Sequence, residues 1–450
     1  MAIDADVIAA IATPPGRGGI GVVRVSGPDV SRVIEGVIGR ALEPRLATLA
    51  NFFDAGGQTL DQGLALWFPA PASYTGEAVL ELQGHGGSAV LGLILKRCVE
   101  LGARLAEPGE FTKRAFLNDK IDLAQAEGVA DLIDAATGTA ARAAARSLSG
   151  AFSREVGGVV ATLIELRTLT EAALDFPDED IDFIRAADAQ GKLSALRERA
   201  AALTARSRQG SLLRDGLHVV LVGAPNVGKS SLLNRLVGDD VAIVTPHPGT
   251  TRDAIRSRIE IRGIPLHVID TAGLRDAVDE IERMGIERTW ATIAHADLAL
   301  IVTDARDVEG PPPALAAQLP SALARIVVRN KIDLVGDVPR RAGKDGGRTV
   351  WLSAKTGAGI DLLRDAILEV AGAHEDMEGT FLARERHLHA LDAANEHLGN
   401  AAAHLASVPP PLELFAEELR EAQIALTAIG GKFTADDLLG EIFGRFCIGK

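Results

Sequence analysis

Short apolar runs separated by glycine-rich turns occupy the first part of the chain. Residues 21–25, 64–68 and 79–82 are short apolar segments that predict β-strands, whereas residues 90–101 form an apolar stretch that predicts a helix. Glycines between these runs are typical of tight turns. The pattern predicts an α+β N-terminal domain over residues 1–118.

From residue 119 onward, apolar residues recur at helical spacing, which predicts a helical domain whose first part covers residues 119–214. These apolar positions are Leu123, Ala126, Val129, Ala130, Ile133, Val159, Leu163 and Leu166. The acidic segment DFPDEDIDF, residues 175–183, interrupts the helical pattern at a proline, and a further helical run covers residues 192–208. Its carboxylates resemble metal ligands, but we interpret the segment as a solvated loop.

At residue 217 the pattern changes to apolar strands alternating with helix-like segments, the signature of a parallel sheet in an α/β domain. The predicted strands cover residues 217–222, 265–269, 298–302, 326–328 and 349–352. Beyond residue 372 the chain is helical again, with Leu419, Ala422 and Leu426 on one face, a turn at Gly430 and Gly431, and a last helix that Thr434 can cap. We therefore expect an α/β domain, residues 215–372, inserted into a helical domain that resumes over residues 373–450.

Composition limits the partners and the compartment. The 450 residues carry a formal net charge of -14, which argues against a protein that coats nucleic acid, so any RNA would be met by a local patch or through another protein. The two cysteines, Cys98 and Cys447, exclude a disulfide framework, and neither has neighbours at zinc-ligand spacing. The start of the chain is acidic, and no apolar run reaches membrane-spanning length. We expect a cytoplasmic protein with no membrane partner and a buried Cys98.

The segment GAPNVGKS, residues 223–230, lies between a predicted strand and a helical run, the context of a phosphate-binding loop. Its glycines allow backbone N–H groups to converge on phosphate. Lys229 is placed to reach the β- and γ-phosphates, and the Ser230 hydroxyl is placed to bind Mg2+. The segment predicts a P-loop, so the α/β domain is expected to be a nucleotide-binding G domain.

Three more motifs follow at the ends of predicted strands. Asp270 opens DTAG, residues 270–273, which can hold Mg2+ through water and sense the γ-phosphate. Asp333 closes NKID, residues 330–333, and its carboxylate can accept hydrogen bonds from the ring N–H and amino group of guanine, which selects GTP over ATP. Residues 353–355, SAK, complete the base pocket. The expected GTP-binding residues are Asn226, Val227, Gly228, Lys229, Ser230, Ser231, Thr245, Thr250, Thr251, Asp270, Thr271, Ala272, Gly273, Asn330, Lys331, Asp333, Ser353, Ala354 and Lys355.

Residues 243–253, IVTPHPGTTRD, form a loop between the P-loop and DTAG, and Thr251 can complete the Mg2+ shell in an order–disorder switch. Many small signalling GTPases place a glutamine after DTAG to orient the attacking water, but this chain has Leu274 there. Another group must do that work. The candidates just downstream are Arg275, Asp276, Asp279, Glu280 and Glu282, and the residue types alone do not choose among them.

Motifs spread over nearly the whole chain resemble one family, the MnmE (TrmE) tRNA-uridine-modifying GTPases. They are ATPPGRGGIGVVRVSG (12–27), YTGEAVLELQGHGG (74–87), PGEFTKRAFLNDKIDLAQAE (108–127), DFPDEDIDF, GTTRD, DTAGLR and the terminal FCIGK (446–450). The resemblance implies a homodimer that works with tRNA and with the FAD-containing protein MnmG. Together they install an aminomethyl-type or carboxymethylaminomethyl group at carbon 5 of the wobble uridine, position 34, of certain tRNAs. The one-carbon unit comes from methylene-tetrahydrofolate.

The resemblance also implies roles for individual residues. Potassium ligands would come from Asn226, Thr245, His247 and Thr250. Glu282 and Arg275 would be catalytic, with Glu282 orienting the water for GTP hydrolysis. His247 and Pro248 vary the family's potassium loop, although a backbone carbonyl can ligate whatever the side chain. Contacts to 5,10-methylene- or 5-formyl-tetrahydrofolate carry over to Arg24, Glu81, Lys120 and Lys450. Glu81 can pair with the pterin edge, and the cations suit the folate carboxylates. Cys447 is either a reactive thiol or a packing residue.

Two other functions are compatible with a G domain. A ribosome-assembly GTPase often adds a basic RNA-binding domain, which the acidic segment LFAEELREAQ does not resemble. A signalling switch would need an external activating protein, and it would hydrolyse GTP without a response to potassium.

Overall fold

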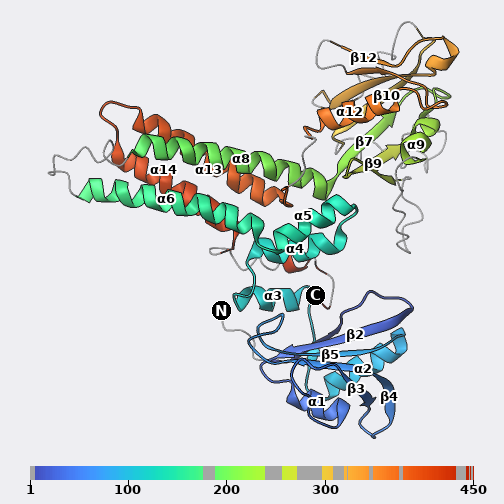
Figure 1. Ribbon diagram of the computed structural model, residues 1–450, viewed down its shortest axis with the longest axis vertical. Coiled ribbons are helices and arrows are strands. Elements are labelled where there is room, and N and C mark those ends of the chain that lie inside the picture. The colour runs from blue at the N-terminus through green and yellow to red at the C-terminus, as the bar shows by residue number, and fades with distance from the viewer. Residues whose placement is uncertain are drawn as a thin grey trace, which may run out of the picture. The chain divides into compact units, whose positions relative to one another are not determined.

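The computed structural model describes residues 6–175, 188–238, 256–270, 296–307, 319–321, 323–343, 348–373, 379–431, 442–444, 446 and 449. The chain forms two compact units, Met1–Ala130 with Gln423–Lys450, and Asp131–Ala422. Figure 1 shows the helices and strands of both units.

The first unit contains a six-stranded sheet of order β3-β4-β5-β2-β1-β6. Its strands are β1 (Ile8–Ile11), β2 (Gly18–Gly27), β3 (Thr48–Phe53), β4 (Thr59–Phe68), β5 (Ala78–Gly86) and β6 (Arg104–Leu105). All pairs are antiparallel except β1 with β6. The three strands predicted from the sequence lie within β2, β4 and β5. In this register Arg24 on β2 lies opposite Glu81 on β5.

Helices α1 (Ser31–Ile38) and α2 (Ser88–Glu100) share a core with one face of this sheet. Alternation along β5 explains the packing, because Leu80 and Leu82 are fully buried and Glu81 between them is not. Cys98 of α2 lies in this core, and burial raises the pKa of its thiol to about 12. The predictions of an α+β N-terminal domain and of a buried Cys98 are confirmed.

The end of the chain completes the first unit. After α3 (Glu110–Leu117), helix α4 (Leu123–Asp134) supplies apolar residues to a core that contains Ile442, Phe443 and Phe446. Gly109, the residue before α3, has φ +66°, and a Cβ there would lie 2.7 Å from the Phe443 carbonyl oxygen. The approach is too close for any other residue.

The second unit contains long helices that pack along one another. They are α5 (Gly138–Leu148), α6 (Ala151–Asp175), α8 (Ala189–Asp215), α13 (Glu385–Leu405) and α14 (Leu412–Ile429), the last of which extends into the first unit. Val159, Leu163 and Leu166 of α6 are buried, as their spacing predicts. Helix α8 packs against both α6 and α13 and is longer than the predicted run of residues 192–208. Among the described residues, no helix combines the length and apolarity needed to cross a bilayer.

The α/β part of the second unit is built on a seven-stranded sheet of order β12-β13-β11-β10-β7-β9-β8. Its strands are β7 (Leu217–Val222), β8 (Arg256–Ile261), β9 (Ile264–Asp270), β10 (Leu298–Asp304), β11 (Ala324–Asn330), β12 (Arg340–Ala342) and β13 (Thr349–Trp351). The five predicted strands are the parallel ones. The edge strands β8 and β12, which were not predicted, are antiparallel to their neighbours, so the predicted parallel strands form the central part of a mixed sheet.

The chain enters the α/β part from α8 and leaves it for α13, and these two helices pack together. The α/β part is therefore an insertion in a helical domain. Helix α5 shares the core of the sheet through Ala143 and Ala144. The hydroxyl of Thr137, which caps α5, donates a 2.9 Å hydrogen bond to the carbonyl of Gly263, in the turn between β8 and β9. The domain boundaries predicted near residues 118, 214 and 372 stay predictions.

Candidate functional site

The predicted nucleotide motifs converge at the carboxyl ends of the parallel strands. The P-loop follows β7, Asp270 ends β9, Asn330 ends β11, and Ser353 follows β13. Because these strands are parallel neighbours, their ends meet at one edge of the sheet, the usual place for a ligand in an α/β fold.

The P-loop adopts a backbone that few residues tolerate. Asn226 has φ +61° and Gly228 has φ +101°. A Cβ at Gly228 would lie 2.3 Å from Nδ2 of Asn330, so a side chain here would displace the residue that holds the loop. Helix α9 (Lys229–Gly238) begins directly after Gly228, so its first backbone N–H groups are directed toward the loop. Ser230 and Ser231 are exposed in this first turn.

Asn330 joins three segments of the site. It is 2% exposed, and its Nδ2 donates to the carbonyl of Val227 at 2.9 Å. Its Oδ1 accepts hydrogen bonds from the backbone N–H groups of Lys331, at 2.8 Å, and Ala354, at 2.9 Å. The asparagine of the NKID motif is therefore a structural link between the P-loop and the 353–355 segment.

Asp333 and Lys331 lie on the base side of the site. The Ser353 hydroxyl donates to Oδ1 of Asp333 at 2.6 Å, and Asp333 is otherwise exposed, so its carboxylate is oriented and accessible. The Lys331 ammonium donates to the carbonyl of Asn226 at 2.6 Å. Arg235 of α9 holds the 353–355 segment by donating to the carbonyls of Ala354 and Lys355. Lys229 donates to the carbonyls of Gly223 and Ala224 at 2.7 and 3.1 Å.

The structure thus brings together the described members of the predicted set. These are Asn226, Val227, Gly228, Lys229, Ser230, Ser231, Asn330, Lys331, Asp333, Ser353, Ala354 and Lys355. Asp270 is described as the last residue of β9, without its side chain. The other predicted nucleotide, metal and catalytic residues lie outside the described residues: Thr245, His247, Thr250, Thr251, Thr271, Ala272, Gly273, Arg275 and Glu282.

The chemistry of the donors fits the predicted ions as far as these residues are described. For Mg2+ the described ligand is the exposed Ser230 hydroxyl at the start of α9, an oxygen donor of the kind that ion prefers. For potassium it is Asn226, whose exposed side chain carries an amide oxygen in the P-loop itself.

The predicted set lacks Arg235, and it also lacks a buried carboxylate at the end of β10. Asp304, the last residue of β10, is 6% exposed and accepts hydrogen bonds from Arg306 and Lys331. The bonds from Arg306, with a smaller contribution from Lys331, hold the pKa of its carboxyl well below the ordinary value despite burial. The signal that could have revealed it is its position, since an aspartate ends the apolar strand LALIVTD just as Asp270 ends β9.

The predicted folate residues lie in the first unit, and two of them contact each other. Arg24 donates from Nε to Oε1 of Glu81 at 3.0 Å, and its Nη2 lies 2.9 Å from the same oxygen in an ion pair. The Arg24 guanidinium also lies 5.6 Å from the ring centre of Tyr74 and 5.7 Å from that of Phe111. The Lys120 ammonium donates to the carbonyl of Pro71 at 3.1 Å, in the loop that carries Tyr74. Lys450 and Cys447 lie outside the described residues.

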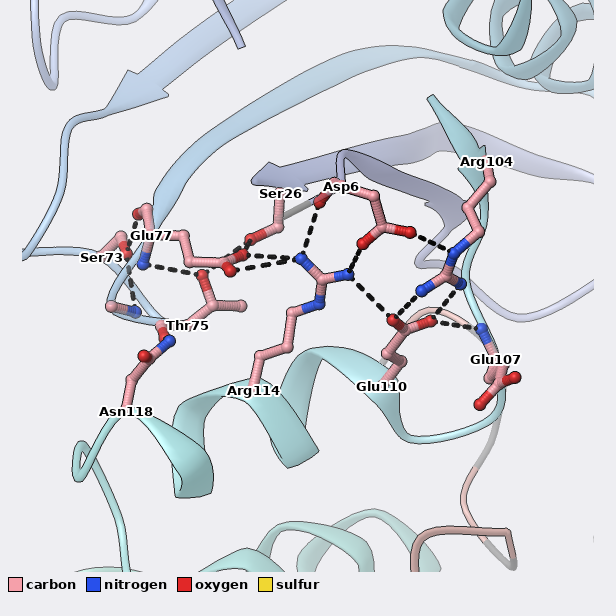
Figure 2. A network of polar contacts seen from close by, with 11 residues as sticks. Asp6, Ser26, Ser73, Thr75, Glu77, Arg104, Glu107, Glu110, Arg114 and Asn118 are labelled. Atoms are coloured by element: carbon pink, nitrogen blue, oxygen red, sulfur yellow. Dashed lines mark hydrogen bonds and ion pairs between the residues drawn. The ribbon is translucent and has the colours of Figure 1, made fainter. Parts of the chain in front are cut away.

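A buried ionic network supports this part of the first unit (Figure 2). At its centre is Arg114 of α3, 3% exposed, which donates to Glu77, to Glu110 and to Asp6. Glu77 also accepts a 2.9 Å hydrogen bond from Ser26 of β2. The network ties α3 to β2 and to the loop that precedes β5. It therefore holds the backbone on which Arg24, Tyr74 and Glu81 are mounted.

Two family models match the chain. One, described as the MnmE helical domain, matches residues 123–447, and the other, described as the GTP-binding protein TrmE N-terminus, matches residues 7–120. Proteins named tRNA modification GTPase MnmE are similar over nearly the full length. That of Ralstonia nicotianae is 59% identical over 98% of this chain and 96% of its own. That of Thiobacillus denitrificans is 59% identical over 99% of this chain and 98% of its own. That of Cupriavidus metallidurans is 56% identical over 100% of both chains.

Proposed function

The chain belongs to the MnmE family of tRNA modification GTPases and is a GTP hydrolase acting in tRNA modification; we propose that it is a potassium-dependent homodimer. It works with the FAD-containing protein MnmG in a heterotetramer or larger complex. The complex installs an aminomethyl or carboxymethylaminomethyl group at carbon 5 of uridine 34 in certain tRNAs, with a one-carbon unit from methylene-tetrahydrofolate.

The observation that supports the nucleotide part of this proposal is the convergence of the P-loop, Asn330, Asp333 and Ser353 at one sheet edge. Lys229 and the N–H groups at the start of α9 bind the phosphates. Asp333, oriented by Ser353, pairs with the guanine edge. Glu282 orients the attacking water and Arg275 assists. We assign Ser230 and Thr251 to the Mg2+ shell.

Asn226 is the residue on which the potassium proposal rests. It lies in the P-loop between the base side and the phosphate side, with its backbone in the left-handed region. Thr245, His247 and Thr250 complete the proposed ligand set. A monovalent cation held there supplies positive charge where negative charge builds in the transition state, the task that an arginine performs in other GTPases. No external activating protein is then needed.

The test is GTP hydrolysis in KCl and in NaCl at equal ionic strength. We expect hydrolysis at least tenfold faster in KCl, a response that Asn226→Ala abolishes, and hydrolysis at least tenfold slower in Glu282→Ala because the water loses its orienting group. Arg340→Ala, which removes a surface cation stacked on Trp351, should keep the full potassium response. Equal, slow rates in both salts would leave a GTP-binding switch that awaits an outside activator.

The folate part of the proposal rests on the Arg24–Glu81 pair. Arg24 contacts Glu81 through Oε1, and we assign the second oxygen, Oε2, to the N–H and amino edge of the pterin. Tyr74 and Phe111 hold the guanidinium from its other sides, so the carboxylate is presented in one orientation. Lys120 and Lys450 meet the glutamate carboxylates of the folate. Cys447→Ser tests whether the thiol reacts with the folate. Loss of tRNA modification with GTP hydrolysis intact would support that role, and full modification activity would end it.

Replacing Glu81 by Gln should weaken 5-formyl-tetrahydrofolate binding about tenfold, because the neutral amide gives up a charge-assisted hydrogen bond. Equilibrium dialysis measures the change. Glu100→Gln, on the exposed side of α2, is the matched control and should bind the folate like the unmodified chain. Unchanged affinity in Glu81→Gln would remove the assigned role of this carboxylate.

A further inference from the structure

Asp304 occupies a place in the nucleotide site that the assigned motifs leave unexplained. It ends β10, between the strands that lead to the P-loop and to Asn330. The backbone N–H of Ala305, the next residue, donates to the carbonyl of Asn330 at 2.7 Å. The carboxylate is thus buried at the centre of the sheet edge, beside the motif that reads guanine.

The carboxylate holds Lys331 in one position. The Lys331 ammonium donates to Oδ2 of Asp304 at 2.9 Å and to the carbonyl of Asn226 at 2.6 Å, so it bridges β10 and the P-loop. A lysine stem has four rotatable bonds, so fixing it in one conformation costs rotamer entropy. Two acceptors on opposite sides offset that cost before the nucleotide binds.

The second partner of Asp304 is less important for this bridge. Arg306 forms two side-chain hydrogen bonds with the carboxylate, at 2.9 and 2.7 Å, but its own side chain is 58% exposed. Water can replace the contacts of the exposed Arg306 guanidinium, whereas Lys331 carries the connection to the P-loop. Removal of Arg306 leaves that connection in place.

We propose that Asp304 is a positioning residue for GTP binding, which fixes the Lys331 ammonium against the Asn226 carbonyl and so joins the guanine side of the site to the P-loop. The left-handed backbone of Asn226 directs its carbonyl toward Lys331, and the bridge holds it there. Asp304 acts on the nucleotide through Lys331. The specificity for guanine belongs to Asp333.

The test is GDP affinity in Asp304→Asn, which keeps the shape of the side chain and removes its charge. We expect the Kd for GDP to rise about tenfold, because a charge-assisted hydrogen bond is lost. Arg306→Ala, the matched control, should stay within twofold of the unmodified chain. In a Lys331→Ala background, Asp304→Asn should add less than a twofold change, since the two residues act as one unit.

Inosine diphosphate separates positioning from a general loosening of the site. Asp304→Asn should weaken GDP and inosine diphosphate by the same factor, because the amino group that distinguishes them pairs with Asp333. The proposal is overturned by a GDP affinity within twofold of normal in Asp304→Asn, by an equal loss in Arg306→Ala, or by a full tenfold loss in the Lys331→Ala background. If Asp304→Asn does not fold, Lys331→Met decides, since unchanged GDP affinity there also ends the proposal.

Discussion

Asp333→Asn should bind GTP roughly 1000-fold more weakly than the unmodified chain and should prefer xanthosine triphosphate. The carboxylate accepts hydrogen bonds from two guanine donors, the ring N–H and the amino group. In the amide, an NH2 group replaces one of the two acceptor oxygens, so it faces one of these guanine donors and leaves that donor unpaired. Xanthine has a carbonyl where guanine has its amino group, so the amide pairs with it. Isothermal titration of the unmodified chain and of the variant with GTP, GDP and xanthosine triphosphate measures the switch.

Asp337→Asn is the matched control for this experiment. Asp337 is four residues further along the same segment and pairs with Arg340 at the surface. Its replacement should leave the affinities for GTP and for xanthosine triphosphate within twofold, because its side chain pairs with Arg340 at the surface. A loss of GTP binding in Asp333→Asn with no gain for xanthosine triphosphate would mean that the carboxylate holds the loop and does not read the base.

Arg114→Met should lower the free energy of unfolding of the first unit by about 3–5 kcal/mol. The substitution removes the cation that Glu77 and Glu110 share, so the buried Glu77 loses the cation paired with it, while Glu110 keeps its pair with Arg104. Arg104→Met should cost only about 1 kcal/mol, since the Arg104 side chain is 41% exposed and water replaces its contacts. Urea unfolding followed by circular dichroism compares the two variants. If the two variants lost the same free energy of unfolding, burial of the charged side chain would not determine how much stability is lost.

The same network makes stability depend on pH in a defined direction. Burial disfavours the charged form of Glu110, but hydrogen bonds from Arg104, from the backbone N–H of Glu107 and from Arg114 outweigh it and lower its pKa. A lowered pKa contributes stability above the ordinary carboxyl range near pH 4, and this contribution is lost as the pH falls through the folded-state value. In Arg114→Met the free energy of unfolding should fall less steeply below pH 5. The hydrogen bond from Arg114 that helps to lower the pKa of Glu110 is already absent from this variant.

The parallel strands were predictable and the edge strands were not, for a physical reason. Strands buried on both faces, such as β7 and β10, are continuous apolar runs, and that pattern is visible in the sequence. The edge strand β8 begins with the polar residues Arg256, Ser257 and Arg258, and Ile259 and Ile261 are its only apolar residues, so its sequence resembles a solvated loop. Its place is set by pairing with β9, which a local pattern does not contain.

The nucleotide site was predictable in its motifs, since P-loop, DTAG, NKID and SAK are short and each follows a strand. Contacts between motifs were not predictable. Asp304 and Lys331 are bonded to each other but separated in sequence, and nothing local distinguishes Asp304 from other strand-terminal aspartates. Arg114 likewise meets Asp6 and Glu77 only because the fold brings three distant segments together. Charge pairs of this kind are products of topology.

The two segments that form the first unit are translated at different times, because the second unit lies between them in the sequence. Leu123 and Ala126 pack against Phe443 and Phe446, so the apolar face of α4 is made early and its cover is made last. All the residues of the second unit are translated in between. At roughly 5–20 residues per second, this leaves the apolar face uncovered for tens of seconds on each nascent chain. The apolar face of α4 therefore receives its cover only after the whole second unit has been translated.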